Sequence, residues 1–434
     1  MTAKFALSPT RIAPGITPKP SFLDGLAKRA LLARLQRLAH GQIDVVDGAE
    51  VHRFGRRTAR CPLSATVHVR DQRFYRDVAF GGSIGSGEAY MHGHWFANDL
   101  TALVRILIQN REVLDGMETG LARLTAPVQK LFHLLNRNSQ TGSRRNIAAH
   151  YDLGNEFFRL FLDDTLMYSA AIFERPGMTL GQAQEARLDR ICRKLALGAN
   201  DHVLEIGTGW GGFALHAAGR YGCRVTTTTI SREQYDLARE RVARAGLSDR
   251  VTLLLEDYRE LRGEYDKLVS IEMIEAVGHE YYETFFARCS ALLKPDGLML
   301  LQAITIADQR YEAARKSVDF IQRYIFPGSC IPSVSVMAGA LARATDLRMV
   351  HLEDIGPHYA VTLRHWRERL RANADAARGL GLSEEFLRMW EFYLCYCEGG
   401  FVERALGDVQ LLLAKPQNRD ALTVPPLATP PAQG

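Results

Sequence analysis

The sequence predicts an α/β fold in which a parallel, doubly wound sheet follows a smaller α+β N-terminal domain. Three observations predict it: short apolar runs alternate with amphipathic helical segments in the second half of the chain, a glycine-rich segment joins one apolar run to the next helix, and a polar, basic stretch at 136–146 separates the halves. Such alternation is typical of a parallel sheet whose helices cover both faces.

The first half divides into a flexible lead-in and a small domain. Residues 1–20 contain four prolines and no sustained periodicity, so we predict that they are flexible. Residues 21–40 have the spacing of an amphipathic helix with basic residues at the edge of its apolar stripe. Strand-like alternation follows at 43–82 and a helical region at about 98–136. We assign 21–140 to the N-terminal domain.

The second half contains the sheet. Helices are predicted at 180–196, 211–221 and 231–245, between strands formed by HVLEI, CRVTTTTI, VTLLLED, DKLVSIE and GLMLLQAI. A mostly helical insertion at 306–345 interrupts this order. The domain is expected to span 145–415, and 416–434, rich in proline and alanine, to be a flexible tail.

Composition excludes several classes of protein. The 434 residues carry a net charge of +5, and no apolar run reaches the roughly 18 residues that a membrane span needs. The seven scattered cysteines have no zinc-finger spacing, so we expect reduced thiols, no metal and a cytoplasmic location. No aromatic-basic signature or zinc module favours nucleic acid as a partner.

The segment VLEIGTGWGG joins a strand to a helix. Gly207 and Gly209 lack a Cβ, so a ligand can approach the backbone, and the following helix offers free N–H groups. With Gly212 they satisfy G-x-G-x-x-G, which alone leaves a dinucleotide dehydrogenase open. However, no carboxylate ends the next strand, at 226–229, where such an enzyme would bind ribose. With Glu205 and Gly211 the pattern becomes E-x-G-x-G-x-G, which resembles the first motif of class I S-adenosylmethionine methyltransferases.

Eight segments in the same order resemble the cyclopropane-fatty-acyl-phospholipid synthase family, which includes mycolic acid methyltransferases. They are HYDLGNEFFRLFLD (150–163), LMYSAAIFE (166–174), VLEIGTGWGG (203–212), TTISREQ (228–234), IEAVGHEYY (274–282), YIFPGSCIPS (324–333), IGPHYAVTL (355–363) and YLCYCEGGF (393–401). GSGEAYMHGHW (85–95) resembles the family's extra N-terminal domain. The resemblance implies a class I methyltransferase fold, S-adenosylmethionine as donor, an unsaturated acyl chain of a membrane phospholipid as acceptor, and a lipid-binding or accessory role for 21–140. It also suggests a homodimer and contact with the inner face of the membrane.

The resemblance also implies site residues. Its cofactor contacts fall on Tyr168, Ser169, Gly207, Gly209, Thr229, Ile230, Gln234, Asp257 and Tyr258, together with Glu205 and Gly211 of the glycine motif. Its bicarbonate ion, which serves as the base, would be lined by Glu275, Gln302, Tyr359 and the backbone of Ile304, and its C-terminal motif cysteine falls on Cys397. Ala170 and Gln302 replace a cysteine and a histidine that many members have, so the binding of bicarbonate stays open.

The chemistry explains which groups are needed. An alkene is a poor nucleophile, so the methyl group must be presented to it in a dry pocket. The resulting carbocation can be stabilised by aromatic faces, for which Tyr168, Phe173, Tyr281, Tyr282 and Phe326 are candidates. A base then removes a proton from the transferred methyl group, and the ring closes; Glu275 could act directly or by orienting an ion. A hydride shift before proton loss would instead give a methylene- or methyl-branched chain.

Structural interpretations stand beside the functional ones. Glu275 could simply interact with a helix dipole, Tyr359 could be a core tyrosine, and Cys397 could be a packing thiol. Because of Ala170 and Gln302, a non-catalytic lipid-binding protein with a methyltransferase fold is the alternative from another functional class.

Overall fold

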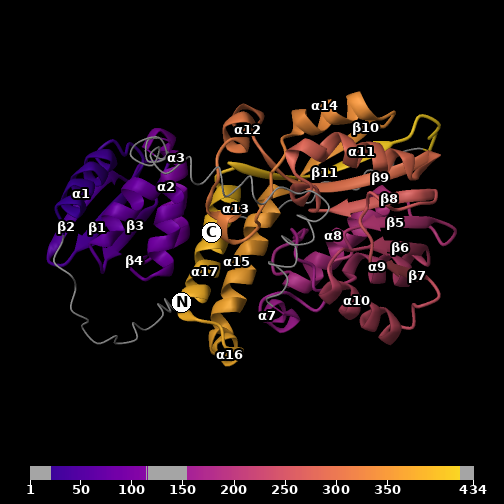
Figure 1. Ribbon diagram of the computed structural model, residues 1–434, viewed down its shortest axis with the longest axis horizontal. Helices are drawn as coiled ribbons and strands as arrows, with labels where there is room; N and C mark the ends of the chain where they lie inside the picture. Colours follow the sequence, from indigo (N-terminus) through magenta and orange to yellow (C-terminus); the bar gives the residue numbers. More distant parts are fainter. Residues whose placement is uncertain (1–20, 114, 116–153, 421–434) are drawn as a thin grey trace. The chain divides into compact units, whose positions relative to one another are not determined.

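The computed structural model describes residues 21–113, 115 and 154–420 (Figure 1). They fall into two compact units: 21–113 with 381–403 form unit 1, and 154–380 with 404–420 form unit 2. The predicted lead-in at 1–20, the polar boundary at 136–146, the start of the 150–163 motif and most of the predicted tail lie outside the described residues.

Unit 1 is an α+β arrangement around a four-stranded sheet of order β2-β1-β3-β4. Strand β1 pairs with β2 antiparallel and with β3 parallel, and β4 pairs antiparallel with β3. The helices are α1 (Phe22–Leu35), α2 (Arg73–Met91), α3 (Leu100–Gln109) and α17 (Glu384–Val402), and the strands are β1 (Gly41–Asp47), β2 (Glu50–Arg56), β3 (Ser64–Val69) and β4 (Trp95–Ala97).

Helix α1 begins at a capping box between Ser21 and Asp24, as the polar start of its sequence favours. It buries Ala27, Leu31 and Leu35, at the spacing that the amphipathic pattern predicted. Three further apolar side chains near its beginning lie in solvent, with exposed fractions of 82% for Phe22, 51% for Leu23 and 45% for Leu26. This group forms an exposed apolar patch on unit 1.

Helix α17 belongs to unit 1, which differs from the domain boundaries expected from the sequence. It packs on α2 and α3, where Gly399 lies so close to Val104 that a Cβ would overlap it. Thr101 donates a hydrogen bond to Glu398 (3.2 Å), and Arg105 forms an ion pair with Glu403 (2.7 Å). Small residues and ion-paired side chains on the surface of α17 therefore hold this helix in unit 1. The sequence motifs do not indicate either feature.

Unit 2 is built on a seven-stranded sheet of order β10-β11-β9-β8-β5-β6-β7. The predicted doubly wound α/β fold is confirmed: β5 to β9 pair in parallel, with helices between them. Two antiparallel strands, which are not among the predicted strands, extend the β9 edge. The strands are β5 (His202–Ile206), β6 (Arg224–Thr228), β7 (Val251–Leu254), β8 (Tyr265–Ile271), β9 (Leu293–Ile306), β10 (Arg348–Asp354) and β11 (Leu406–Ala414).

Each face of this sheet is covered by its own layer of helices, because alternate residues of a strand point to opposite faces. Leu204 and Ile206 pack with α11 (Tyr282–Ala291) and α14 (Val334–Ala344). Val203 packs on the other face with residues of α8 (Leu180–Lys194), α9 (Gly212–His216) and α10 (Arg232–Arg244). Each fully buried apolar side chain of this kind contributes about 1.5–3 kcal/mol, so both layers help to fix the strand register.

The predicted insertion is helical and contains α12 (Asp308–Arg315) and α13 (Phe320–Tyr324) before α14. Unit 2 also contains α7 (Asn155–Arg159), α15 (Gly356–Ala372) and α16 (Ala374–Gly379). Among the described helices, none combines the length and the apolar character that crossing a membrane requires.

Candidate active site

The strand order creates a topological switch point between β5 and β8. From β5 the chain proceeds outward through β6 and β7, and then returns to add β8 on the other side of β5. In open α/β sheets, ligands bind outside the carboxyl ends of the strands at such a point. Gly207 follows β5 there, and Glu272 follows β8.

The glycine turn requires its glycines. Gly207, Gly209 and Gly211 have φ values of 104°, 51° and 85°, a region that side chains with a Cβ rarely adopt. Gly212 begins α9, where a Cβ would lie 2.9 Å from the carbonyl oxygen of Thr165 and would overlap Met167. The turn is therefore packed against the segment that carries Tyr168 and Ser169.

Two predicted cofactor residues meet after β6. The Thr229 hydroxyl donates to Oε1 of Gln234 (2.8 Å), and the neighbouring Ser231 caps helix α10. Ile230 lies between them and is partly exposed. After β7, Asp257 is buried and forms an ion pair with Arg259 (2.7 Å), while the Tyr258 ring packs against Phe285.

Glu205 lies beneath the turn. Its carboxylate is buried and accepts a hydrogen bond from Thr227 (2.6 Å), whose hydroxyl also contacts that of Thr208 (2.7 Å). Burial raises the pKa of Glu205 to about 8. The described contacts of this side chain therefore connect β5 to β6, and they hold the base of the glycine turn.

Aromatic rings surround Tyr168. Its ring centroid lies 5.2 Å from that of Trp366, 5.5 Å from Phe158 and 6.2 Å from Phe326.

Of the predicted cation-stabilising residues, the structure thus brings Tyr168 and Phe326 together. It places the others elsewhere: Phe173 stacks on His365, Tyr281 faces Arg259, and Tyr282 donates to the carbonyl of Cys330. Trp366, on α15, was not predicted.

Glu272 lies at the centre of the site, although it belongs to none of the residues that the sequence motifs indicate. Its Oε1 accepts hydrogen bonds from the side chain of Gln302 (2.7 Å) and the backbone N–H of Ala170 (2.9 Å). Its Oε2 accepts from the Tyr359 hydroxyl (2.8 Å). Glu272 also has a φ of 49°, and a non-glycine residue held in this region costs about 1–3 kcal/mol, which is typical of functional sites.

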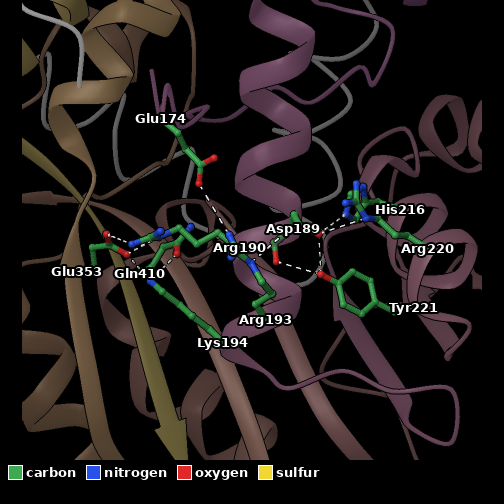
Figure 2. A network of polar contacts seen from close by, with 10 residues as sticks. All are labelled: Glu174, Asp189, Arg190, Arg193, Lys194, His216, Arg220, Tyr221, Glu353 and Gln410. Carbon is green, nitrogen blue, oxygen red and sulfur yellow. Dashed lines mark hydrogen bonds and ion pairs between the residues drawn. The ribbon is translucent and has the colours of Figure 1, made fainter. Parts of the chain in front are cut away.

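A buried chain of polar contacts fixes the orientation of Gln302. Figure 2 shows Lys194, on α8, reaching both Glu353 and Gln410, each of which accepts a hydrogen bond from its ammonium group (2.6 and 2.7 Å). An ammonium group can only donate, so Gln410 presents its oxygen to Lys194 and its amide N–H to Gln302 (3.0 Å). The Gln302 oxygen accepts this bond, which leaves its NH₂ group to face Glu272.

Two more carboxyl groups adjoin Glu272. Glu275 accepts a hydrogen bond from the backbone N–H of Ile304 (2.5 Å) through Oε1, and its buried Oε2 has no partner among the described residues. Burial, and then the charge of Glu272, raise the pKa of Glu275 to about 8. Asp408 is fully buried, 3.3 Å from the Gln302 amide nitrogen, and burial and Glu272 raise its pKa well above the usual range. Burial raises the pKa of Glu272 as well, and its three hydrogen-bond donors oppose that rise.

Replacing Glu275 with glutamine is expected to make the protein more stable at high pH. The pKa of Glu275 is raised in the native state, so between about pH 4.5 and 8 the unfolded chain releases a proton that the folded protein retains, and wild-type stability falls as pH rises. The variant escapes this loss, so its free energy of unfolding should exceed the wild type's by up to about 4 kcal/mol near pH 8 and by little near pH 4. Denaturant unfolding at several pH values measures this difference.

The exposed Glu233 on α10 provides the matched control. Glu233→Gln should follow the wild-type curve at every pH. A difference between Glu275→Gln and wild type that stays constant from pH 4 to 8 would contradict the raised pKa.

Cys397, the last of the predicted site residues, belongs to the other unit. It lies on α17 in unit 1, whereas Glu275, Gln302, Ile304 and Tyr359 lie in unit 2. Glu272 could have been noticed in the sequence, because a single acid directly follows the buried strand DKLVSI, where ligands of parallel sheets bind. Trp366 carries no comparable signal, since its position depends on how α15 packs.

The glycine turn and the aromatic and carboxylate groups around this switch point define a class I S-adenosylmethionine-dependent methyltransferase. Residues 138–411 match the family model described as mycolic acid cyclopropane synthetase, and the chain belongs to that family. The family resemblance and the enzyme class expected from the sequence are thereby confirmed, and a non-catalytic protein is no longer the alternative.

Named relatives agree with this class. The chain is 41% identical over 346 residues to tuberculostearic acid methyltransferase UfaA1 of Mycobacterium tuberculosis, covering 78% of this chain and 80% of that protein. It is 37% identical over 353 residues to cyclopropane-fatty-acyl-phospholipid synthase of Escherichia coli, covering 80% and 86%. These relatives support methyl transfer to lipid acyl chains.

Two solved structures of cyclopropane synthases are similar to this chain in fold. The cyclopropane synthase MmaA2 from Mycobacterium tuberculosis aligns with a TM-score of 0.59 at 33% identity, covering 63% of this chain and 98% of that one. Mycolic acid cyclopropane synthase CmaA1, complexed with SAH and CTAB, aligns with the same score at 34% identity and the same coverage. The bound SAH supports S-adenosylmethionine as the donor.

Proposed function

We propose that this methyltransferase transfers the methyl group of S-adenosylmethionine to the double bond of an unsaturated phospholipid acyl chain, and that ring closure gives a cyclopropane. One observation carries the proposal: an ionisable carboxylate, held by three donors, lies in the same cluster as the aromatic residues Tyr168 and Trp366. Aromatic faces can stabilise a carbocation without capturing it, and a carboxylate can then remove its proton.

Residues of this chain would have the following roles in the reaction. The glycine turn at 207–212 and the polar groups of Thr229, Gln234 and Asp257 would bind the donor. Tyr168 would lie between donor and acceptor, since its segment contacts both the glycine turn and Glu272. Glu275 and Tyr359 would act near the reacting carbons, and Cys397 would have a packing role.

A methyl- or methylene-branched product is the second candidate. The 41% identity to a protein named tuberculostearic acid methyltransferase favours it. The two products share the methyl transfer and differ in which proton the base removes from the cation, so the product itself must be examined.

Expression in a host that lacks cyclopropane and branched lipids tests the function. Phospholipid acyl chains should gain one CH₂ by mass spectrometry and show cyclopropyl protons by NMR, whereas methyl or methylene signals would establish the second candidate. In vitro, labelled donor and mono-unsaturated phospholipid vesicles should place the label in the lipid fraction. Label confined to water-soluble products would overturn the proposal.

We also propose that unit 1 contacts the inner membrane surface through the exposed apolar patch of Phe22, Leu23 and Leu26. The neighbouring exposed Arg29 would favour anionic phospholipids. Sedimentation with the same vesicles supplies the readout: Leu26→Glu should reduce the bound fraction, and unchanged binding would remove this part of the proposal.

A further inference from the structure

Bicarbonate, the base that the family resemblance implies, does not fit the groups that would hold it. The Tyr359 hydroxyl and the Gln302 amide both donate to Glu272, at 2.8 and 2.7 Å. The backbone N–H of Ile304 donates to Glu275. The donors of that site are therefore already used by carboxylates of the chain, and an added anion would lie beside two acidic side chains.

Glu272 makes the contacts that a bound planar anion would need. One oxygen accepts hydrogen bonds from the Ala170 backbone N–H and the Gln302 amide, and the other accepts from the Tyr359 hydroxyl. Both oxygens of the carboxylate therefore have donors. The Gln410 and Lys194 contacts hold the amide of Gln302 in the donating orientation. As a whole residue, Glu272 is partly exposed, while Glu205, Glu275 and Asp408 are buried.

We propose that the Glu272 carboxylate is the base of the reaction and takes the place of bicarbonate in this enzyme. The inference rests on the proposed function. The alkene's electron pair forms a bond to the donor methyl group as the S–CH₃ bond breaks, which releases S-adenosylhomocysteine and leaves a cation on the neighbouring carbon. Glu272 then takes a proton from the new methyl group, and the electrons of that C–H bond close the ring. Glu272 ends protonated and returns its proton to water.

The backbone conformation of Glu272 allows a direct test of its role as the base. Because its φ is 49°, glycine fits this position without strain, and Glu272→Gly also frees the three donors. We expect this variant to lose about 10²–10⁴-fold in lipid methylation while it still binds S-adenosylmethionine by calorimetry. Added bicarbonate or formate should restore at least about tenfold, because a small anion can then occupy the freed donors.

Glu272→Gln is the matched control, since it fills the same space without a basic oxygen. It should be as inactive as Glu272→Gly, and it should not respond to bicarbonate. The wild-type enzyme should work equally well in CO₂-free buffer and with added bicarbonate.

The outcomes separate this inference from the proposed function. A wild-type enzyme that methylates lipid only when bicarbonate is present, or a Glu272→Gly variant with full activity, would overturn the inference alone. A wild-type enzyme that binds the donor but methylates no unsaturated lipid would overturn the proposed function and this inference with it.

Discussion

Arg187→Met is expected to lose most of its methyl transfer at neutral pH and to recover part of it as the pH rises. Burial raises the pKa of Glu272 and of Asp408, and the positive charge of Arg187, which is fully buried on α8, opposes that rise. Without this charge the pKa of Glu272 rises, so the base ionises only at higher pH. We expect the rate at neutral pH to fall by about tenfold.

The measurement is the rate of lipid methylation from pH 6 to 10, with the donor saturating. The rising limb of the variant's profile should lie at higher pH than the wild type's. Arg187→Lys is the control, because it retains the charge and loses the hydrogen bonds to Ser169 (3.0 Å) and Gln184 (2.8 Å). Its profile should stay near that of the wild type, even if its rate is lower.

A uniform fall in rate at every pH would contradict this electrostatic role. It would indicate that Arg187 acts only through packing, for example by holding Ser169 against the glycine turn. Thermal unfolding and donor binding, measured on the same variants, distinguish a damaged fold from a shifted base. Removing one partner from a buried set of charges typically destabilises by about 3–5 kcal/mol, so some loss of stability is expected in Arg187→Met.

The sheet of unit 2 was predictable because a short, continuous stretch of sequence indicates each of its parallel strands and helices. Each parallel strand is a short apolar run, and each helix between strands shows its own periodicity, so the strand–helix order can be read directly. Strands β10 and β11 follow the helical insertion, where this order is interrupted, and their antiparallel pairing depends on β9. The assignment of α17 to unit 1 could not be predicted from the sequence either, because its partners α2 and α3 lie about 300 residues earlier in the chain.

The site was predictable in part for the same reason. Gly207, Gly209 and Gly211 could be selected because a glycine turn between strand and helix has a local signature. Glu272 could not be ranked above Glu275 from spacing alone, since its importance arises from donors on three separate segments around 170, 302 and 359. Of the two substitutions that leave bicarbonate binding open, Gln302 is explained by its amide group, which donates to Glu272. The Ala170 contact is made by the backbone N–H, which any residue at this position would supply, so the structure does not explain the alanine side chain.

Gly212→Ala is expected to abolish most donor binding, because this glycine joins the cofactor turn to the segment that carries Tyr168. A Cβ at this position would lie 2.9 Å from the Thr165 carbonyl oxygen, closer than such contacts occur, and would overlap Met167. The carbonyl cannot easily retreat, since Arg241 binds both it (3.1 Å) and the carbonyl of Trp210 (2.6 Å). The strain must therefore pass into the turn at 207–211 or into the segment at 165–170.

Overpacking of this kind costs about 1–3 kcal/mol, which corresponds to about a tenfold to hundredfold weaker affinity for S-adenosylmethionine. Lipid methylation should fall further, because Ala170 follows in the same segment and its N–H holds Glu272. Calorimetry with the donor measures the first effect and lipid labelling the second. Gly219→Ala is the control, since a Cβ there would make an ordinary contact of 3.7 Å with Leu247. If both alanine variants bound the donor like the wild type, the glycine turn would not be the donor site, and the methyltransferase chemistry assigned to this switch point would need another location.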